Sequence, residues 1–162
     1  MQIRVATRAD VPAMTEILNW AIAETDAIFR AFPASIAERE ELFDHVAATG
    51  TQLVAEEDGE VLGFAYYKPF GDPAIWIGAH EDTIYVSPAA HGRGVGTALL
   101  GSLIEAARAD ERVHTLLARI TTNNATSVAL HEKFGFVLTG TLREVTRKFD
   151  AWLDLHTLQL IL

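Results

Sequence analysis

The sequence contains no cysteine among its 162 residues. This absence excludes disulfide bonds, thiolate nucleophiles and cysteine-based metal sites. Any acyl transfer by this chain must therefore proceed without a cysteine acyl-enzyme. The six histidines form no H-x-x-x-H pair and no cluster with carboxylates at the spacing of metal ligands. We therefore expect no metal centre.

Positive charge and long apolar runs are also scarce. Lysine and arginine number 13 against 22 acidic residues, which gives a formal net charge of −9. An acidic surface repels nucleic acid, so we expect no DNA or RNA partner. No apolar run approaches the roughly 18 residues of a membrane helix, and residues 1–5 form a strand-like alternation rather than a signal region. We expect a cytoplasmic protein with no membrane partner.

The hydrophobic pattern predicts an α/β protein, with residues 1–162 forming a single domain. Helices are expected at about 11–22, 35–48, 94–110 and 124–134. Strands are expected at 2–6, 51–57, 61–68, 81–87, 113–120, 136–140, 143–149 and 152–161. Asp58-Gly59 is a strong hairpin turn, and residues 69–79 are irregular. This order favours a mixed sheet with helices on both faces.

Three closely spaced glycines, Gly92, Gly94 and Gly96, follow a predicted strand and open a predicted helix. Such a loop directs unpaired backbone N–H groups outward, and the helix dipole adds positive potential, so the segment predicts a phosphate site. Arg93 can add a positive charge. No lysine follows Gly96, which excludes a P-loop, and the G-x-G-x-G order is not the dinucleotide fingerprint. The alternative is an ordinary glycine-rich turn.

Two runs resemble one known family. The glycines followed by Thr97-Ala98-Leu99-Leu100 resemble the pyrophosphate loop of the GCN5-related N-acetyltransferases (GNAT). Residues 123–136 resemble the N-x-x-S/A-x-x-L-[Y/H]-E-x-x-G-F segment of the same family, in the expected order. The resemblance implies a mixed, mostly antiparallel sheet of six to seven strands. It also implies that the strands splay at an acyl-CoA site, with acetyl-CoA as cosubstrate and no metal.

Residues 81–86, 130–132 and 148–154 are similar to the phosphinothricin and methionine-sulfone acetyltransferase subgroup. This similarity implies direct acetyl transfer to the primary amine of a small amino-acid analogue such as phosphinothricin, methionine sulfone or methionine sulfoximine. It also implies a homodimer, and residues 155–162 either extend a neighbour's sheet or pack in their own core. Two alternatives stay open: a non-catalytic acyl-CoA sensor, and an acetyltransferase for peptide or protein N-termini.

The resemblance assigns Glu81 as the general base. An ordinary carboxylate is a weak base for an ammonium group, so we expect burial to strengthen it or a water molecule to relay the proton. The alternative is a solvated glutamate flanked by His80 and Asp82 as further surface groups. His131 is the candidate general acid for the leaving thiolate. The alternative for His131 is a satisfied histidine on a helix face.

Backbone N–H groups near Tyr85 and Val86 are the candidate contacts for the thioester carbonyl, which makes Tyr85 a catalytic candidate as well. The alternative is a fully paired strand in which the Tyr85 side chain is core. The residues expected to bind acetyl-CoA are Tyr85, Val86, Ser87, His91, Gly92, Arg93, Gly94, Val95, Gly96, Thr97, Asn124 and Lys133. Asn124 also favours a helix N-cap.

The residues expected on the substrate side are Asn19, Phe29, Arg30, Lys68, Trp76, Ile77, Gly78 and Thr83. The segment before Glu81 contains no arginine, which leaves Lys68 and Arg30 as candidates for binding a substrate carboxylate. Trp76 and Ile77 either pack within the fold or form an apolar substrate wall.

Overall fold

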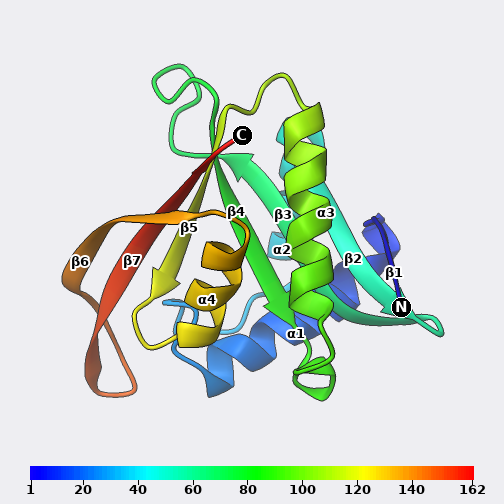
Figure 1. The fold of residues 1–162 in the computed structure, drawn as a ribbon. Coiled ribbons are helices and arrows are strands. Elements are labelled where there is room, and N and C mark those ends of the chain that lie inside the picture. The colour runs from blue at the N-terminus through cyan, green and yellow to red at the C-terminus, as the bar shows by residue number, and fades with distance from the viewer.

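A twisted seven-stranded sheet runs through the computed structural model, which describes residues 1–162 (Figure 1). The strands are β1 (Gln2–Val5), β2 (Thr51–Glu57), β3 (Glu60–Pro69), β4 (Ala79–Val86), β5 (Thr115–Thr121), β6 (Val137–Lys148) and β7 (Ala151–Ile161). The α-helices are α1 (Val11–Glu24), α2 (Ile36–Thr49), α3 (Val95–Ala109) and α4 (Ala125–Lys133). Figure 1 shows α3 and α4 on one side of the sheet and α1 and α2 on the other.

The strand order is β1-β2-β3-β4-β5-β7-β6, and every neighbouring pair is antiparallel except β4 with β5. These two parallel strands pair only at Ala79–Thr115, His80–Leu116 and Glu81–Leu117. Past Glu81 they diverge, and the gap widens toward the end of β4 (Figure 1). The expected sheet, mostly antiparallel with splayed strands, is therefore confirmed.

Two apolar cores hold the helices against the sheet. The α3 face buries Leu99, Leu100 and Leu103 completely, because these residues recur at helical spacing on one side of the helix. The opposite core packs Met14 and Leu18 of α1 against the sheet. Side chains of β4 pack against both cores, so this strand is held in place from both faces of the sheet.

The structure differs from the predicted elements in the β6 region. Residues 137–148 form one strand, where the pattern indicated two shorter ones. Its pairing with β7 shifts register between Leu138 and Gly140 and again between Leu142 and Thr146, and Glu144 has a positive φ of 50°. These irregularities break the two-residue alternation, so the sequence pattern looks interrupted although the strand continues. β4 also begins at Ala79, two residues earlier than expected.

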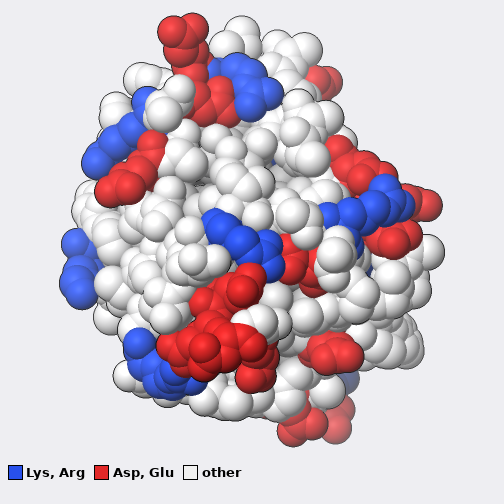
Figure 2. All heavy atoms as spheres, turned by 90° about the vertical axis from the view of Figure 1, so that its right-hand side faces the viewer, with Lys and Arg blue, Asp and Glu red and all other residues white.

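Acidic and basic side chains are interspersed on the face seen in Figure 2. Several ion pairs join separate elements: Arg4 contacts Asp10 and Glu56, and Arg8 contacts Glu40 and Asp44. The pairs of Arg8 are exposed and contribute little to stability, whereas Asp10 is buried beside Arg4. The two apolar cores are therefore the main support of the fold. None of the helices has the length and apolar character needed to cross a membrane.

Candidate active site

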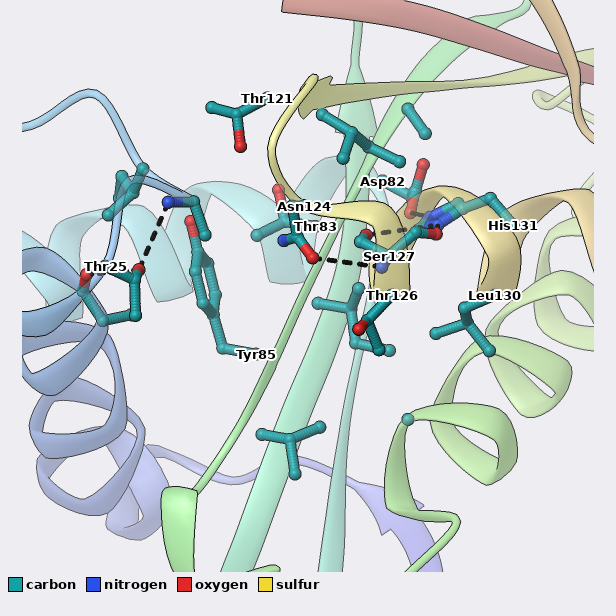
Figure 3. A pocket seen from close by; sticks show the side chains of 18 of the residues that line it. Thr25, Asp82, Thr83, Tyr85, Thr121, Asn124, Thr126, Ser127, Leu130 and His131 are labelled. Atoms are coloured by element: carbon teal, nitrogen blue, oxygen red, sulfur yellow. Dashed lines mark hydrogen bonds and ion pairs between the residues drawn. The ribbon is translucent and has the colours of Figure 1, made fainter. Parts of the chain in front are cut away.

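A cleft of about 1120 Å³ opens where β4 and β5 separate. Its lining comes from the loop after α1, the second half of β4, the glycine loop with the start of α3, the end of β5, and α4. Figure 3 shows Thr83 and Tyr85 on β4 and Thr126, Ser127 and Leu130 on α4 around the same space. The cleft therefore brings both sequence signatures together.

The glycine loop presents unpaired main-chain N–H groups to this cleft. Gly92 and Gly94 have φ values of 75° and 78°, and a Cβ atom at either position would meet no atom within 4 Å. Their N–H groups make no hydrogen bond. The N–H groups of residues 95–97 lie in the first turn of α3, where the helix supplies no acceptor. Together with the helix dipole, this geometry suits a phosphate.

The side chains of the glycine loop contribute less than its backbone. The His91 Nε2 atom lies 3.2 Å from the Val86 carbonyl oxygen and donates to it, which ties the loop to the end of β4. The Arg93 guanidinium forms an ion pair with Glu57. Neither Arg93 nor Ser87 lines the cleft. The main chain, rather than the loop arginine, is therefore the anion-binding element.

The free edge of β4 can be assigned from one hydrogen bond. The Ser87 N–H donates to the Leu62 carbonyl oxygen at 2.8 Å, so Ser87 turns its backbone toward β3. Because residues along a strand alternate in direction, Tyr85 also turns its N–H toward β3, while Ile84 and Val86 turn theirs toward the open side. Val86 therefore offers the N–H that the sequence placed near Tyr85 and Val86.

Tyr85 contributes its side chain to the cleft wall (Figure 3). Its ring centroid lies 5.6 Å from that of Phe64, and the ring packs against the core on the α1 side of the sheet. Burial raises the pKa of the Tyr85 hydroxyl, so this group is a neutral phenol at physiological pH.

Glu81 lies at the last paired position of β4, where the cleft begins. It is 9% exposed, and its flanking residues His80 and Asp82 are 5% and 6% exposed. The alternative of a solvated glutamate among surface groups is therefore wrong, because this end of β4 is paired on both sides, with β3 and β5, and all three residues are buried. The Glu81 Oε1 atom accepts from Arg119 Nε at 2.5 Å, and Oε2 lies 3.8 Å from Lys68 Nζ.

His131 forms a buried pair with Asp82. Its Nε2 lies 2.9 Å from Asp82 Oδ2, and its Nδ1 lies 2.7 Å from the Ser127 carbonyl oxygen (Figure 3). A carbonyl only accepts, so Nδ1 carries a proton, and an ionised Asp82 requires a second proton on Nε2. Burial opposes the charged ring, but the hydrogen bond to Asp82 and its charge outweigh burial and raise the pKa of His131.

Asn124 takes the N-cap role that the sequence offered. Its Oδ1 accepts from the Ser127 N–H at 3.1 Å, which makes it the N-cap of α4. Its Nδ2 makes no hydrogen bond, and the residue lines the cleft. Lys133, exposed at the end of α4, also lines the cleft.

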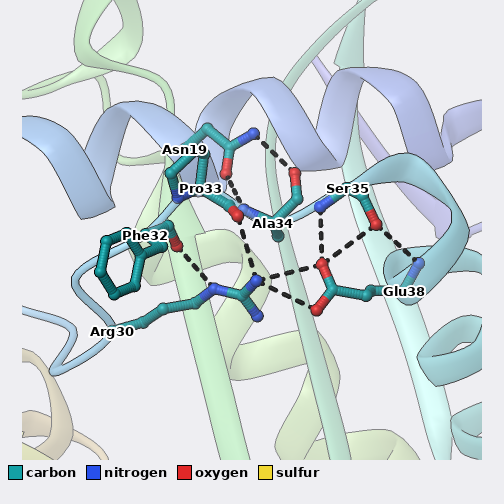
Figure 4. A network of polar contacts seen from close by, with 7 residues as sticks. All are labelled: Asn19, Arg30, Phe32, Pro33, Ala34, Ser35 and Glu38. Atoms are coloured by element: carbon teal, nitrogen blue, oxygen red, sulfur yellow. Dashed lines mark hydrogen bonds and ion pairs between the residues drawn. The ribbon is translucent and has the colours of Figure 1, made fainter.

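Asn19 and Arg30 organise the loop between α1 and α2 (Figure 4). Asn19 exchanges two hydrogen bonds with the main chain of Ala34, at 3.0 and 2.7 Å, and does not line the cleft. The Arg30 guanidinium donates to the carbonyls of Phe32 and Pro33 and pairs with Glu38. Arg30 lines the cleft, and its Nε and Nη2 atoms are held by this loop and by Glu38.

The remaining substrate-side candidates divide into two groups. Phe29 and Thr83 line the cleft. Lys68, Trp76, Ile77 and Gly78 do not. Trp76 packs edge-on against Phe70 with ring centroids 5.3 Å apart, and Ile77 is 84% exposed.

Sequence reasoning missed three residues in this region. Arg119 of β5 and Trp20 of α1 line the cleft, and Asp82 holds His131. The available signal for Arg119 was a single charge inside the apolar run of residues 116–120. Trp20 has no such signal, because its position matches an ordinary helix face; its ring meets that of His91 at 5.7 Å.

Comparisons with known proteins agree with this geometry. Residues 14–136 match the acetyltransferase (GNAT) family. The chain is 39% identical over 160 residues to the L-methionine sulfoximine/L-methionine sulfone acetyltransferase of Pseudomonas paraeruginosa, covering 98% of this chain and 92% of that protein. It is 34% identical to a phosphinothricin N-acetyltransferase of Streptomyces coelicolor, covering 95% and 92%.

A solved structure extends the similarity to three dimensions. The putative acetyltransferase yncA from Salmonella typhimurium, determined with its cofactor acetyl-CoA, matches with a TM-score of 0.96 at 36% identity. The match covers 99% of this chain and 93% of that one.

Proposed function

The chain belongs to the acetyltransferase (GNAT) family and is an acetyl-CoA-dependent N-acetyltransferase, and we propose that its acceptor is the α-amine of a small amino-acid analogue of the methionine-sulfone or phosphinothricin type. The observation that carries this proposal is that the unpaired N–H groups of Gly92, Gly94 and residues 95–97 lie in the same cleft as Glu81. Because the chain is an enzyme, the alternative of a non-catalytic acyl-CoA sensor no longer applies.

The cleft offers groups that suit successive parts of acetyl-CoA. The N–H groups of the glycine loop suit the diphosphate, and the free Nδ2 of Asn124 suits the pantetheine arm. The open edge of β4 offers the N–H groups of Ile84 and Val86 to the arm and the thioester carbonyl. Acetyl-CoA supplies the activated acyl group, so the protein needs no covalent intermediate of its own.

In a direct transfer of the acetyl group, different residues of the cleft carry out different steps. Glu81 accepts a proton from the acceptor ammonium, which frees the nitrogen lone pair to form the new bond to the acetyl carbon, and the nitrogen releases its second proton to water as the amide forms. The Val86 N–H stabilises the carbonyl oxygen as negative charge develops there. His131 lines the cleft, and as general acid it releases to the sulfur one of the two N–H protons that it shares with Asp82 and the Ser127 carbonyl, as the carbon–sulfur bond breaks. Holding both substrates in one cleft lowers the entropic barrier.

A thiol-release assay tests the acceptor. Purified protein with acetyl-CoA is expected to turn over methionine sulfone, methionine sulfoximine or phosphinothricin, and a Glu81→Gln variant is expected to bind acetyl-CoA normally while losing at least about 100-fold in kcat. Polyamines and a peptide with a free N-terminus complete the panel. Tight acetyl-CoA binding combined with turnover of the peptide alone would refute the small-molecule acceptor.

We also propose that two copies associate through β6. This strand is the edge of the sheet and leaves Val137, Leu138, Leu142 and Val145 exposed. β7, in contrast, is paired on both sides by β5 and β6, so residues 155–161 pack within their own sheet.

A further inference from the structure

Arg119 is a half-exposed cation at the point where β4 and β5 separate. It lies two residues past Leu117, the last β5 residue that pairs with β4, and its backbone is held on the other side by Thr157 of β7. The neighbouring Ala118 and Ile120 are buried, whereas the Arg119 side chain is 49% exposed and lines the cleft. A rigid strand therefore presents a charged group to the space where the acceptor must enter.

The guanidinium of Arg119 is only partly used. Its Nε donates to Glu81 Oε1 at 2.5 Å, and its two terminal nitrogen atoms, Nη1 and Nη2, make no hydrogen bond or ion pair. Those two groups provide the donor geometry that binds a carboxylate. Since Nε is already held by Glu81, the two terminal nitrogen atoms are oriented before any ligand binds.

Of the cations that line the cleft, only Arg119 forms an ion pair with Glu81. Arg30 pairs with Glu38 instead and donates to two loop carbonyls, and Lys133 lies at the end of α4. Lys68 faces Glu81 but does not line the cleft.

The Glu81–Arg119 pair is the electrostatic complement of an amino-acid head group. An α-amino acid carries its ammonium and its carboxylate on one carbon, so the two charges enter a site side by side. We propose that Arg119 binds the acceptor's α-carboxylate while Glu81 receives its α-ammonium. This assignment rests on the proposed function and narrows it, because it makes a free α-carboxylate the feature that selects the acceptor.

Two acceptors that differ only in the carboxylate test the assignment. Methionine sulfone is compared with 3-(methylsulfonyl)propylamine, its decarboxylated counterpart, using wild-type protein and the variants Arg119→Gln and Arg119→Lys at saturating acetyl-CoA. Arg119→Gln is expected to raise KM for methionine sulfone by about 10- to 100-fold and to change KM for the amine by less than about twofold. Arg119→Lys keeps the charge but loses the paired donors of the guanidinium. Its KM for methionine sulfone is expected to lie between those of wild type and Arg119→Gln.

The KM ratio between the two acceptors is the discriminating readout, because loss of the contact with Glu81 can lower kcat for both. Arg108→Gln, which changes an exposed arginine outside the cleft, serves as the matched control, and thermal melting confirms folding. An equal change in KM for both acceptors would overturn the role of Arg119 alone. Wild-type protein that binds acetyl-CoA but acetylates neither compound would overturn the proposed acceptor class, and this assignment with it.

Discussion

At the scale of single residues, the buried pair of Asp82 and His131 couples the protonation of His131 to the stability of the fold. The raised pKa of His131 means that the pair stabilises the fold fully below about pH 6.5, the usual pKa of an unfolded histidine. That contribution is lost as the pH rises through the raised pKa of the folded state. The same protonation supplies the general acid in the proposed mechanism, so stability and turnover should decline over the same alkaline range.

Asp82→Asn is expected to separate these effects from packing, because it removes the charge and keeps the shape. Without the carboxylate, the alkaline decline in kcat should move to lower pH. The difference in melting temperature between wild type and variant should also shrink as the pH rises above about 6.5. Glu132→Gln, at an exposed position beside His131, is the control. An unchanged alkaline limb in Asp82→Asn would show that Asp82 does not set the protonation of His131.

A second residue-scale prediction concerns Gly94. Alanine at this position must adopt a φ near 78°, which costs about 1 kcal/mol and favours displacement of the loop backbone that carries the unpaired N–H groups. We expect Gly94→Ala to weaken acetyl-CoA binding at least about tenfold by calorimetry. Gly59→Ala is the matched control, since Gly59 has a φ of 83° and the same open surroundings but lies in the β2–β3 turn. Equal affinities for the two variants would mean that strain, not the cleft, explains any loss.

At the scale of elements, Lys148 joins the β6–β7 hairpin to the loop that walls the cleft. Its buried Nζ donates to the carbonyl oxygens of Ile22, Thr25 and Ile28 at 2.7, 2.7 and 2.9 Å. The ammonium thereby caps the negative end of α1, and all three of its protons are used. Burial lowers the pKa of Lys148, and the neighbouring Asp26 partly opposes this shift.

Replacing Lys148 with methionine should therefore loosen that wall. Three carbonyl oxygens lose a charged donor, which predicts a loss of about 2–4 kcal/mol in the free energy of unfolding, measured with urea. KM for the acceptor should rise more than the Kd for acetyl-CoA, since the loop borders the acceptor side. Arg147→Met, at the neighbouring position with a largely exposed side chain, is the control. A variant as stable as wild type would show that the three hydrogen bonds add nothing net.

Local sequence patterns predicted the helices and strands well, but they did not predict the long-range contacts. The Asp58-Gly59 turn and the Leu99, Leu100 and Leu103 face each encode their structure within a few residues, so they could be located from the sequence. The glycine loop is equally local. The contact of Arg119 with Glu81 depends instead on the register between two strands, and that of Lys148 with Ile22 spans 126 positions. Such contacts are fixed by tertiary packing, which no short pattern contains.

At the scale of the whole molecule, the exposed apolar residues of β6 mark the edge of the sheet as an interface. Val137, Leu138, Leu142 and Val145 are 66%, 48%, 55% and 44% exposed, and Phe149 and Trp152 extend the same hairpin. Residues 137–142 of this edge strand carry no charge, whereas Arg143, Glu144 and Arg147 follow them. An uncharged stretch of edge strand pairs readily with another strand, and a second copy of this chain offers an identical edge.

Placing lysine at both Leu142 and Val145 should therefore convert a dimer into a monomer. Light scattering after size exclusion is expected to give about twice the monomer mass for wild type and the monomer mass for the double variant. Acetyl-CoA binding should persist in the monomer, because the glycine loop lies on the other side of the β4–β5 opening from β6. Ile75→Lys, at a 72% exposed position in the loop before β4, is the matched control and should remain dimeric. A double variant that keeps the dimer mass would place the interface elsewhere, and a monomeric wild type at tens of micromolar would remove it altogether.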